Sequence, residues 1–273
     1  STGVSILTAN SASLQGRGYE IALTTKNTIG AVRWSTNAAL AFTKMKVTKR
    51  YAINSGWRTR DFINYGLNAV EGRPAFSLGS YRYAGLDPVN GNPQGILNGE
   101  ISTDYEAIQN DSIENQVFHG SSQPLYSGFI GNTITWKNIS LSANVTYRLA
   151  FYYRKPTYSH TQVGAGAIHT DFYQRWQKPG DEQHTGIPSL LYPIPANMSA
   201  RNLFYDYSEA NIGRGDHFRL QDIRLKYDWG AKAHQKLPIQ RIQLFVYLNN
   251  INLMIWKMDK SSYDPDYIGA TLF

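Results

Sequence analysis

Residues 139–154 read ISLSANVTYRLAFYYR. Every second side chain, counted from Ile139 to Phe151, is uncharged and mostly apolar or aromatic, whereas those between are mostly small and polar, with two arginines. Strict alternation predicts a β-strand with one apolar and one wet face. The pattern is about three times the mean strand length, and a tilted strand that crosses a bilayer needs about 9–11 residues. This stretch therefore predicts a strand of a transmembrane β-barrel.

Other stretches alternate in the same way. They predict an all-β chain with antiparallel strands at 18–24, 32–43, 125–136, 218–229 and 242–248, within about eight to ten strands overall. In 218–229 the apolar phase changes near Gln221 and Asp222, which predicts a β-bulge that returns Phe218, Leu220 and Ile223 to one face. The segment 105–109 is the one place where we predict a helix, and 75–86 is predicted as one weak strand.

The predicted connections fall into two classes. Those at 27–30, 137–138 and 230–238 are short, while those at 44–74 and 155–216 are long. Outer-membrane barrels have short periplasmic turns and long extracellular loops. Trp34, Trp136 and Trp229 all lie close to the short turns, so we expect them to form one interfacial girdle rather than the core of a soluble sandwich.

The composition agrees with a transmembrane β-barrel and excludes a transmembrane helix. Charged residues are 17%, below the roughly 25% of soluble domains, and aromatic residues reach 13%. No stretch approaches the ~18 consecutive apolar residues of a spanning helix. There is no cysteine, which excludes disulfides and thiolate sites. The net charge of +7 comes from scattered Lys and Arg, which indicates solvated loops and a polar lumen rather than a nucleic-acid partner.

The sequence predicts no catalytic residue, no metal ion and no cofactor. It contains no HExxH, GxSxG or P-loop motif. His160 and His169 share one loop, and Asp171, Asp181 and Glu182 lie near aromatic residues. Their spacing is too loose for a metal site, so we interpret them as polar side chains that keep the loop soluble. We therefore expect binding rather than catalysis.

Candidate binding residues come from the polar phase of the strands and from the long loops. Amide and guanidinium groups beside aromatic rings suit sugars and peptides. The candidates for substrate binding are Arg33, Asn37, Asn144, Arg148, Trp176, Arg219 and Arg224. Further loop aromatics that offer platforms, or that instead pack the loop or touch a partner, are Phe172, Tyr173, Phe204, Tyr205 and Tyr207.

Several segments resemble one family. These are 15–20 (QGRGYE), 81–88 (YRYAGLDP), 175–181 (RWQKPGD), 215–223 (GDHFRLQDI) with Leu225, 249–251 (NNI) and Asp264-Pro265. In this order, and over essentially the whole chain, they resemble the C-terminal part of the SusC/RagA family, the TonB-dependent outer-membrane transporters of Bacteroidetes.

The resemblance implies a 22-stranded barrel that encloses an N-terminal plug and takes up glycans or peptides through the outer membrane. It also implies a SusD-like surface lipoprotein that covers the extracellular loops, and TonB as the source of energy, acting through a segment outside this chain. On this basis residues 1–273 are the C-terminal portion of the barrel wall, without the plug domain. The chain is then a fragment or one piece of a split or nicked transporter, and the remaining barrel and plug are partners, together with outer-membrane lipid.

Two other readings stay open from the residues alone. One is a soluble all-β carbohydrate-binding module with long strands and aromatic loops. The other is a structural barrel piece in an outer-membrane assembly that does not transport. In the first, the apolar phase of 139–151 faces a second sheet; in the barrel it faces hydrocarbon.

Overall fold

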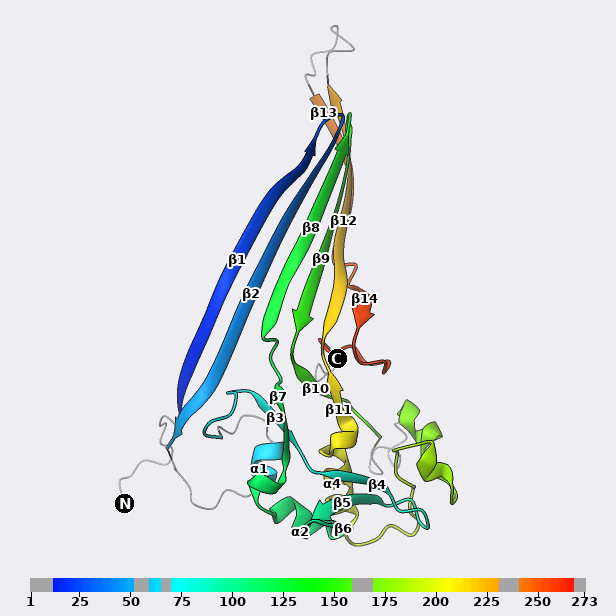
Figure 1. Ribbon diagram of the computed structural model, residues 1–273. Helices are drawn as coiled ribbons and strands as arrows, with labels where there is room; N and C mark the ends of the chain where they lie inside the picture. Colours follow the sequence, from blue (N-terminus) through cyan, green and yellow to red (C-terminus); the bar gives the residue numbers. More distant parts are fainter. Residues whose placement is uncertain (1–11, 52–58, 65–69, 159–168, 231–240, 268–273) are drawn as a thin grey trace, which may run out of the picture.

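A computed structural model describes residues 12–51, 59–64, 70–158, 169–230 and 241–267. The molecule has two regions, a tall sheet and a compact lobe at one end of it (Figure 1). We call the first region the main sheet and the second, built from described residues of 59–125 and 151–214, the lobe. None of the described helices is long and apolar enough to cross a lipid bilayer.

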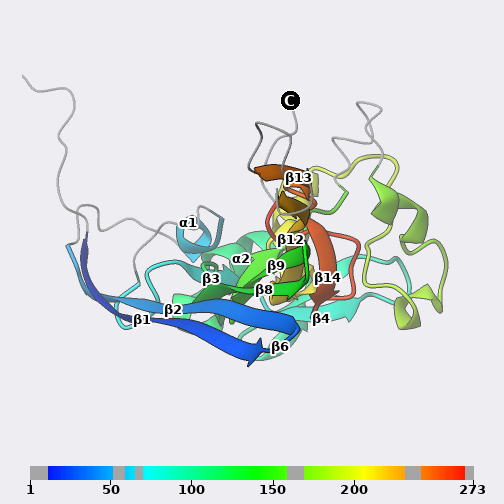
Figure 2. The ribbon, with the colours of Figure 1, turned by 90° about the horizontal axis from the view of Figure 1, so that it is seen from above.

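The main sheet is antiparallel throughout, in the order β1-β2-β8-β9-β12-β13, with β14 also paired to β12. Because β13 and β14 pair with successive halves of β12, the seven strands of this sheet form six columns within the described residues. In Figure 2, β8 and β9 lie on one side of β12 and β14 on the other. The strands are β1 (Ala12–Ile29), β2 (Val32–Arg50), β8 (Tyr126–Trp136), β9 (Ile139–Leu149), β12 (His217–Gly230), β13 (Arg241–Leu248) and β14 (Leu253–Lys257).

The strand predicted at 139–154 ends earlier than expected. β9 stops at Leu149, Ala150 takes a left-handed backbone with φ of 60°, and the following Phe151 is buried. The Asp216 carboxylate accepts the N–H of Ala150, so this donor leaves the ladder. The chain then enters the lobe as β10 (Tyr152–Arg154), which pairs with β11 (Ile212–Arg214).

The predicted bulge in β12 is confirmed. The register of β12 on β9 slips between Leu220 and Asp222, so Gln221 is the extra residue. Leu220 then pairs with Val145 and Ile223 with Ala143, and both lie in the apolar phase of β9. The slip therefore keeps the apolar residues of β12 on one face of the sheet.

Short turns and long connections lie at opposite ends of the main sheet (Figure 1). Lys137 and Asn138 form the predicted two-residue turn between β8 and β9. Since β2 pairs directly with β8, no described part of 51–125 adds a strand to the main sheet. β2 continues to Arg50, so the start of the loop predicted at 44–74 is strand. The turn predicted at 230–238 lies almost wholly outside the described residues.

The lobe has a conventional hydrophobic core, which the sequence did not predict. Tyr81, Tyr105, Ile108, Phe204 and Ile63 form the buried cluster at its centre. The strand predicted at 75–86 is split between two small sheets, whereas the helix predicted near 105–109 is confirmed as α2, with the Asp104 side chain capping its first turn. The lobe contains α1 (Thr59–Asn64), α2 (Tyr105–Asn110), α4 (Met198–Asp206), β3 (Ser77–Ser80) paired with β7 (Val117–Ser121), β4 (Tyr83–Leu86), β5 (Pro93–Leu97), β6 (Glu100–Ser102), and 3-10 turns at Ile113–Asn115, Thr170–Gln174, Asp181–Gln183 and Glu209–Asn211.

Candidate functional site

One face of the main sheet is apolar and is not covered by a second layer within the described residues. Ile21 on β1 is 56% exposed, Leu141 on β9 48% and Val246 on β13 60%. The register places these side chains with those of neighbouring strands on one surface, which we call the apolar face. Its other exposed members include Leu23, Trp34, Ile130, Ile134, Trp136, Ile139, Leu225, Leu244 and Leu248.

Aromatic side chains lie at both ends of the apolar face. Near the lobe, the rings of Tyr19, Phe42 and Tyr126 follow one another with centroids 5.0 Å apart, and those of Tyr147 and Phe218 are 5.7 Å apart. The row continues from Phe218 to Trp256 at 5.8 Å.

Near the turns lie Trp34, Trp136 and Trp229, because the register pairs Val32 with Trp136 and Tyr227 with Ile139. The eleven residues of β8 separate the two rows by about 33 Å along the strand. At a tilt of about 40° this gives a band about 25 Å tall, the height of the apolar band of outer-membrane barrels.

The opposite face, which we call the polar face, carries six of the seven predicted binding residues. Thr133 and Ser142 share a hydrogen bond of 3.0 Å across β8 and β9, and Asn144 donates to Asp222 over 3.3 Å. Near the turn end, Arg33 on β2 is exposed and Arg224 on β12 stacks on the ring of Phe245. The six residues on the polar face are Arg33, Asn37, Asn144, Arg148, Arg219 and Arg224.

The structure brings two of these residues together at the lobe end, around two carboxylates that sequence reasoning did not assign to a site. The guanidinium of Arg219 donates to both oxygens of Asp264, over 3.0 and 2.6 Å, and lies 3.1 Å from Asp266. Arg148 donates to Asp266 over 2.7 Å, and His217 Nε2 lies 3.2 Å from the same carboxylate. We call these five residues the Arg–Asp cluster.

The Arg–Asp cluster fastens the segment after β14 to the polar face. Burial of Asp266 disfavours its charged form, but the hydrogen bond from His217 and the nearby arginine charges outweigh this effect and hold the pKa of Asp266 below its usual value. The carboxylate is therefore ionised, and the contact is a set of charge-assisted hydrogen bonds. The Asp-Pro-Asp sequence was the only available signal, and nothing local to it identifies its partners some 45 or more residues away.

A pocket of about 490 Å³ opens beside the Arg–Asp cluster. Its lining is polar: hydroxyls from β8 and β9, two guanidinium groups and three side-chain amides. Within the described part of the chain, Nε of Arg219 is buried and has no hydrogen-bond partner. Residues that line the pocket include Thr146, Arg148, Arg219, Gln221, Asn250 and Asn252.

The predicted platform Trp176 is not exposed. Its side chain is 7% exposed, its indole N–H donates to Glu182 over 3.1 Å, and its ring packs where a Cβ on Gly91 would be. Among the other loop aromatics, Phe204 and Tyr205 are buried in the lobe, while Tyr173 is 71% exposed. Trp176 therefore packs within the lobe, and its ring does not form an exposed platform.

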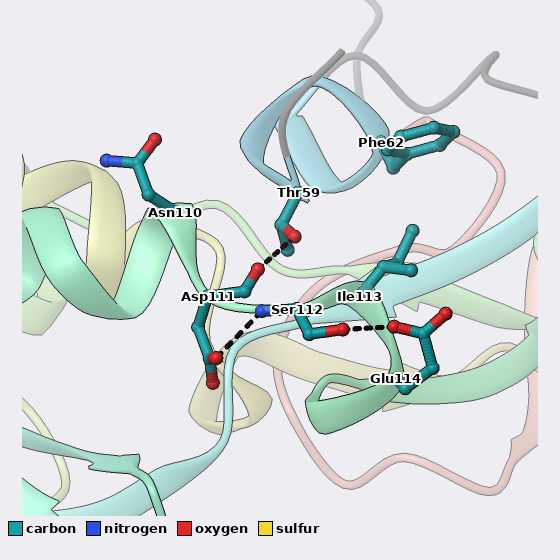
Figure 3. Close-up of a pocket in the computed structure, with 7 residues that line it drawn as sticks. All are labelled: Thr59, Phe62, Asn110, Asp111, Ser112, Ile113 and Glu114. Carbon is teal, nitrogen blue, oxygen red and sulfur yellow. Dashed lines mark hydrogen bonds between the residues drawn. The ribbon is translucent and has the colours of Figure 1, made fainter. Parts of the chain in front are cut away.

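A second pocket, of about 640 Å³, lies between α1 and the end of α2 (Figure 3). Its polar groups already pair with one another: Thr59 donates to the carbonyl of Asp111, the Ser112 amide donates to the Asp111 carboxylate, and the Ser112 hydroxyl donates to Glu114. Figure 3 shows these hydrogen bonds between residues that line the pocket. Because these polar groups already have hydrogen-bond partners within the protein, they do not need a ligand to satisfy them.

No group of three or more metal-ligating side chains occurs among the described residues. His169 forms a hydrogen bond of 2.7 Å with the Tyr263 hydroxyl. This contact joins the lobe to the C-terminal segment. His160, the other histidine of the predicted loop pair, lies outside the described residues.

No family model matches the chain, and no curated protein matches it. Solved structures do match in fold. Chains from a structure of the RagAB peptide transporter and from structures of the RagAB peptide importer in the closed-closed and open-open states are 14%, 17% and 18% identical to this chain, each with a TM-score of 0.65. They cover 94%, 94% and 93% of this chain, and 27%, 27% and 26% of their own length is matched. The chain thus shares their fold over about a quarter of their length.

Proposed function

We propose that this chain is part of the wall of an outer-membrane importer of the SusC/RagA type, a transmembrane β-barrel that takes up peptides or glycans. In this proposal the apolar face meets lipid, the polar face lines the lumen, and the lobe forms the extracellular loops. Further strands complete the barrel around a plug, a SusD-like lipoprotein covers the lobe, and TonB supplies energy through another part of the protein. Residues 1–273 act as one C-terminal portion of that barrel.

The observation that carries the proposal is the uncovered apolar face between two aromatic rows. Soluble proteins rarely expose an apolar patch of more than a few hundred Å², whereas a barrel in lipid requires one. The soluble carbohydrate-binding module needs a second sheet against this face, and the described residues provide none. The main sheet is open at β1 and at β13 and β14 within the described chain, and open edges do not survive in hydrocarbon, so the proposal requires neighbouring strands.

The fold neighbours support import as the activity, and they favour peptides over glycans as cargo. They are a peptide transporter and a peptide importer, and this chain follows their fold along almost all its length. The polar face adds hydroxyl, amide and guanidinium groups, which suit a solute that needs hydrogen bonds rather than an apolar one.

The proposal is tested by adding a charge on each face of β9. Val145 lies in the middle of the apolar face, between Ile130 and Leu220. Val145→Arg places a guanidinium at mid-bilayer, which costs about 2–4 kcal/mol, so we expect loss of folded protein from outer membranes. Ser142→Arg adds the same charge to the polar face of the same strand and is the control, expected to assemble. Equal assembly of both variants, or a protein that is stable and monomeric without detergent, contradicts the membrane proposal.

Transport is separated from a purely structural role by shortening the lobe segment 155–216. An importer loses uptake of labelled peptides when this segment is trimmed, because the lobe then no longer forms the entrance. Undiminished uptake by a correctly assembled variant contradicts a role for the lobe in import and favours a scaffold.

A further inference from the structure

We propose that the lobe end of β1 and β2 binds the phosphate groups of a phosphorylated glycolipid in the outer leaflet of the membrane. The site is a cluster of four exposed cationic side chains just beyond the aromatic row of the apolar face. We call it the basic patch, and its members are Arg17, Lys44, Lys46 and Lys49. The inference rests on the proposed function, because it assumes that the apolar face lies in lipid.

The first argument is the position of the basic patch. Tyr19 pairs with Phe42 in the register of β1 on β2, and Arg17 pairs with Lys44 two residues further toward the lobe. Because side chains two residues apart on a strand point to the same face, the cationic pair continues the apolar face past its aromatic row. Aromatic rows mark the level of the lipid headgroups. A Lys or Arg beside such a row lays its alkyl stem along apolar surface and holds its charge among the headgroups.

The second argument is that the protein does not neutralise these charges. Arg17 lies directly opposite Lys44, and like charges in this arrangement destabilise a sheet. Among the described residues, no ion pair joins a member of the basic patch to a carboxylate, and all 20 Asp and Glu residues of the chain lie within the described ranges. By contrast, Lys226 and Arg241 on the polar face share Asp228. The basic patch therefore requires its anion from outside the chain.

The third argument is the depth of the basic patch, which decides which lipid fits. Lys49 lies opposite Ser13, four residues of β1 beyond the pair of Arg17 and Lys44. This separation is about 13 Å along the strand, or about 10 Å along the membrane normal at a tilt of about 40°. The headgroup region of a phospholipid leaflet is only about 5–7 Å deep. Phosphates carried on a sugar headgroup reach this depth, and Arg and Lys both bind phosphate oxygens.

The fourth argument is access. The basic patch lies on the outward face of β1 and β2, whereas the free edge of β1 is where a further strand of the barrel pairs. Such a strand leaves outward side chains uncovered, because strands in a sheet pair edge to edge. Figure 1 shows β1 and β2 at one edge of the main sheet, reaching the level of the lobe. A lipid of the outer leaflet therefore has direct access to the basic patch in the closed barrel.

Binding of a purified glycolipid to the whole importer in detergent tests the inference. The probe is bisphosphorylated lipid A, the comparison lipid is the same molecule without its phosphates, and native mass spectrometry measures the bound fraction. We expect the parent to prefer the phosphorylated lipid about tenfold, and the preference to fall as salt rises. Equal binding of the two lipids overturns the inference. Displacement of the probe by inorganic phosphate at millimolar concentration also overturns it, because the site then takes free phosphate.

A double variant assigns the binding to the basic patch. Lys44→Gln with Lys46→Gln removes two charges at exposed positions, and we expect about tenfold weaker binding of the phosphorylated lipid with no change for the comparison lipid. Lys26→Gln with Lys178→Gln is the matched control. It lowers the net charge equally at two exposed lysines, one on the polar face of β1 and one in the lobe, and we expect unchanged binding. Parental binding by the first variant, or an equal loss in the control, overturns the inference.

A second double variant covers the case in which the first does not assemble. Arg17→Gln with Lys49→Gln removes the other two charges, and we expect a similar loss. The proposed function is judged separately, by Val145→Arg and by peptide uptake. If the parent meets those tests and shows no preference for the phosphorylated lipid, the basic patch inference fails while the proposed function stands. A protein that is stable and monomeric without detergent contradicts both.

Discussion

The main sheet and the lobe solve the burial of apolar side chains in opposite ways. In the lobe, Phe204 and Ile108 are fully buried against each other and against aromatic neighbours, as in a water-soluble domain. In the main sheet, the apolar side chains of one face are exposed and no second layer of the described residues covers them. The same chain therefore carries two patterns suited to two solvents, and the boundary between them is near Ala150 on one strand and Arg50 on another.

The largest expected difference between the two regions is the cost of truncating an apolar side chain. Phe204→Ala leaves a cavity at the centre of the lobe, and we expect a loss of about 3–5 kcal/mol in unfolding free energy. Under the proposed function, Leu141→Ala on the apolar face removes contact with lipid or detergent, which fills the space, so we expect a loss of about 1–2 kcal/mol with no cavity contribution. Denaturant unfolding of the two variants, followed by a probe in each region, measures the difference. Equal losses contradict the contrast between a packed core and a solvated face.

The Arg–Asp cluster is the next largest effect, because it joins the C-terminal segment to the sheet. Asp264→Ala removes the main partner of the buried Arg219, and we expect a loss of about 2–3 kcal/mol together with faster proteolysis within 258–267. Asp228→Ala breaks the more exposed pair with Arg241, where solvent screening leaves a smaller loss. Similar rates of proteolysis in both variants contradict the idea that the Arg–Asp cluster holds the C-terminal segment against the sheet.

The last expected difference is a pH dependence confined to the lobe. Burial raises the pKa of Asp206 to about 7, above the value of about 4 for an unfolded Asp. The folded lobe then holds a proton that the unfolded chain has lost, so the stability falls as pH rises from about 4 to 7 and is constant above that range. We expect the lobe to melt at a lower temperature at pH 8 than at pH 5, and Asp206→Asn to remove most of this shift. If the Asp206→Asn variant keeps the full pH-dependent shift in melting temperature, the titrating group is a residue other than Asp206.

The alternation in the sequence was enough to locate β8, β9, β12 and β13 and the bulge at Gln221, since one-sided strands leave a clear period of two. It was also enough to place Arg148 and Arg219 on the polar face. Closure of the barrel stays a prediction. The lobe was not predicted because its strands are only three to five residues long and have no period to detect.

Two details of the candidate site depend on contacts distant in sequence. The end of β9 at Leu149 depends on a carboxylate at position 216, and no local signal predicts a left-handed Ala150. The pairing of Arg219 with Asp264 likewise joins residues 45 positions apart. The burial of Trp176 could not be read from the sequence, because a tryptophan in a loop has the same local sequence whether it is exposed or packed on a glycine.

The centre of the lobe draws its side chains from two separate excursions of the chain. Ile63, Tyr81, Tyr105 and Ile108 come from between β2 and β8, whereas Phe204 comes from between β9 and β12. Neither excursion can complete the cluster by itself. In the proposed membrane barrel, assembly therefore has an imposed order: both excursions must first be delivered to the same side of the bilayer, and only then does the lobe close and hold the neighbouring hairpins in register.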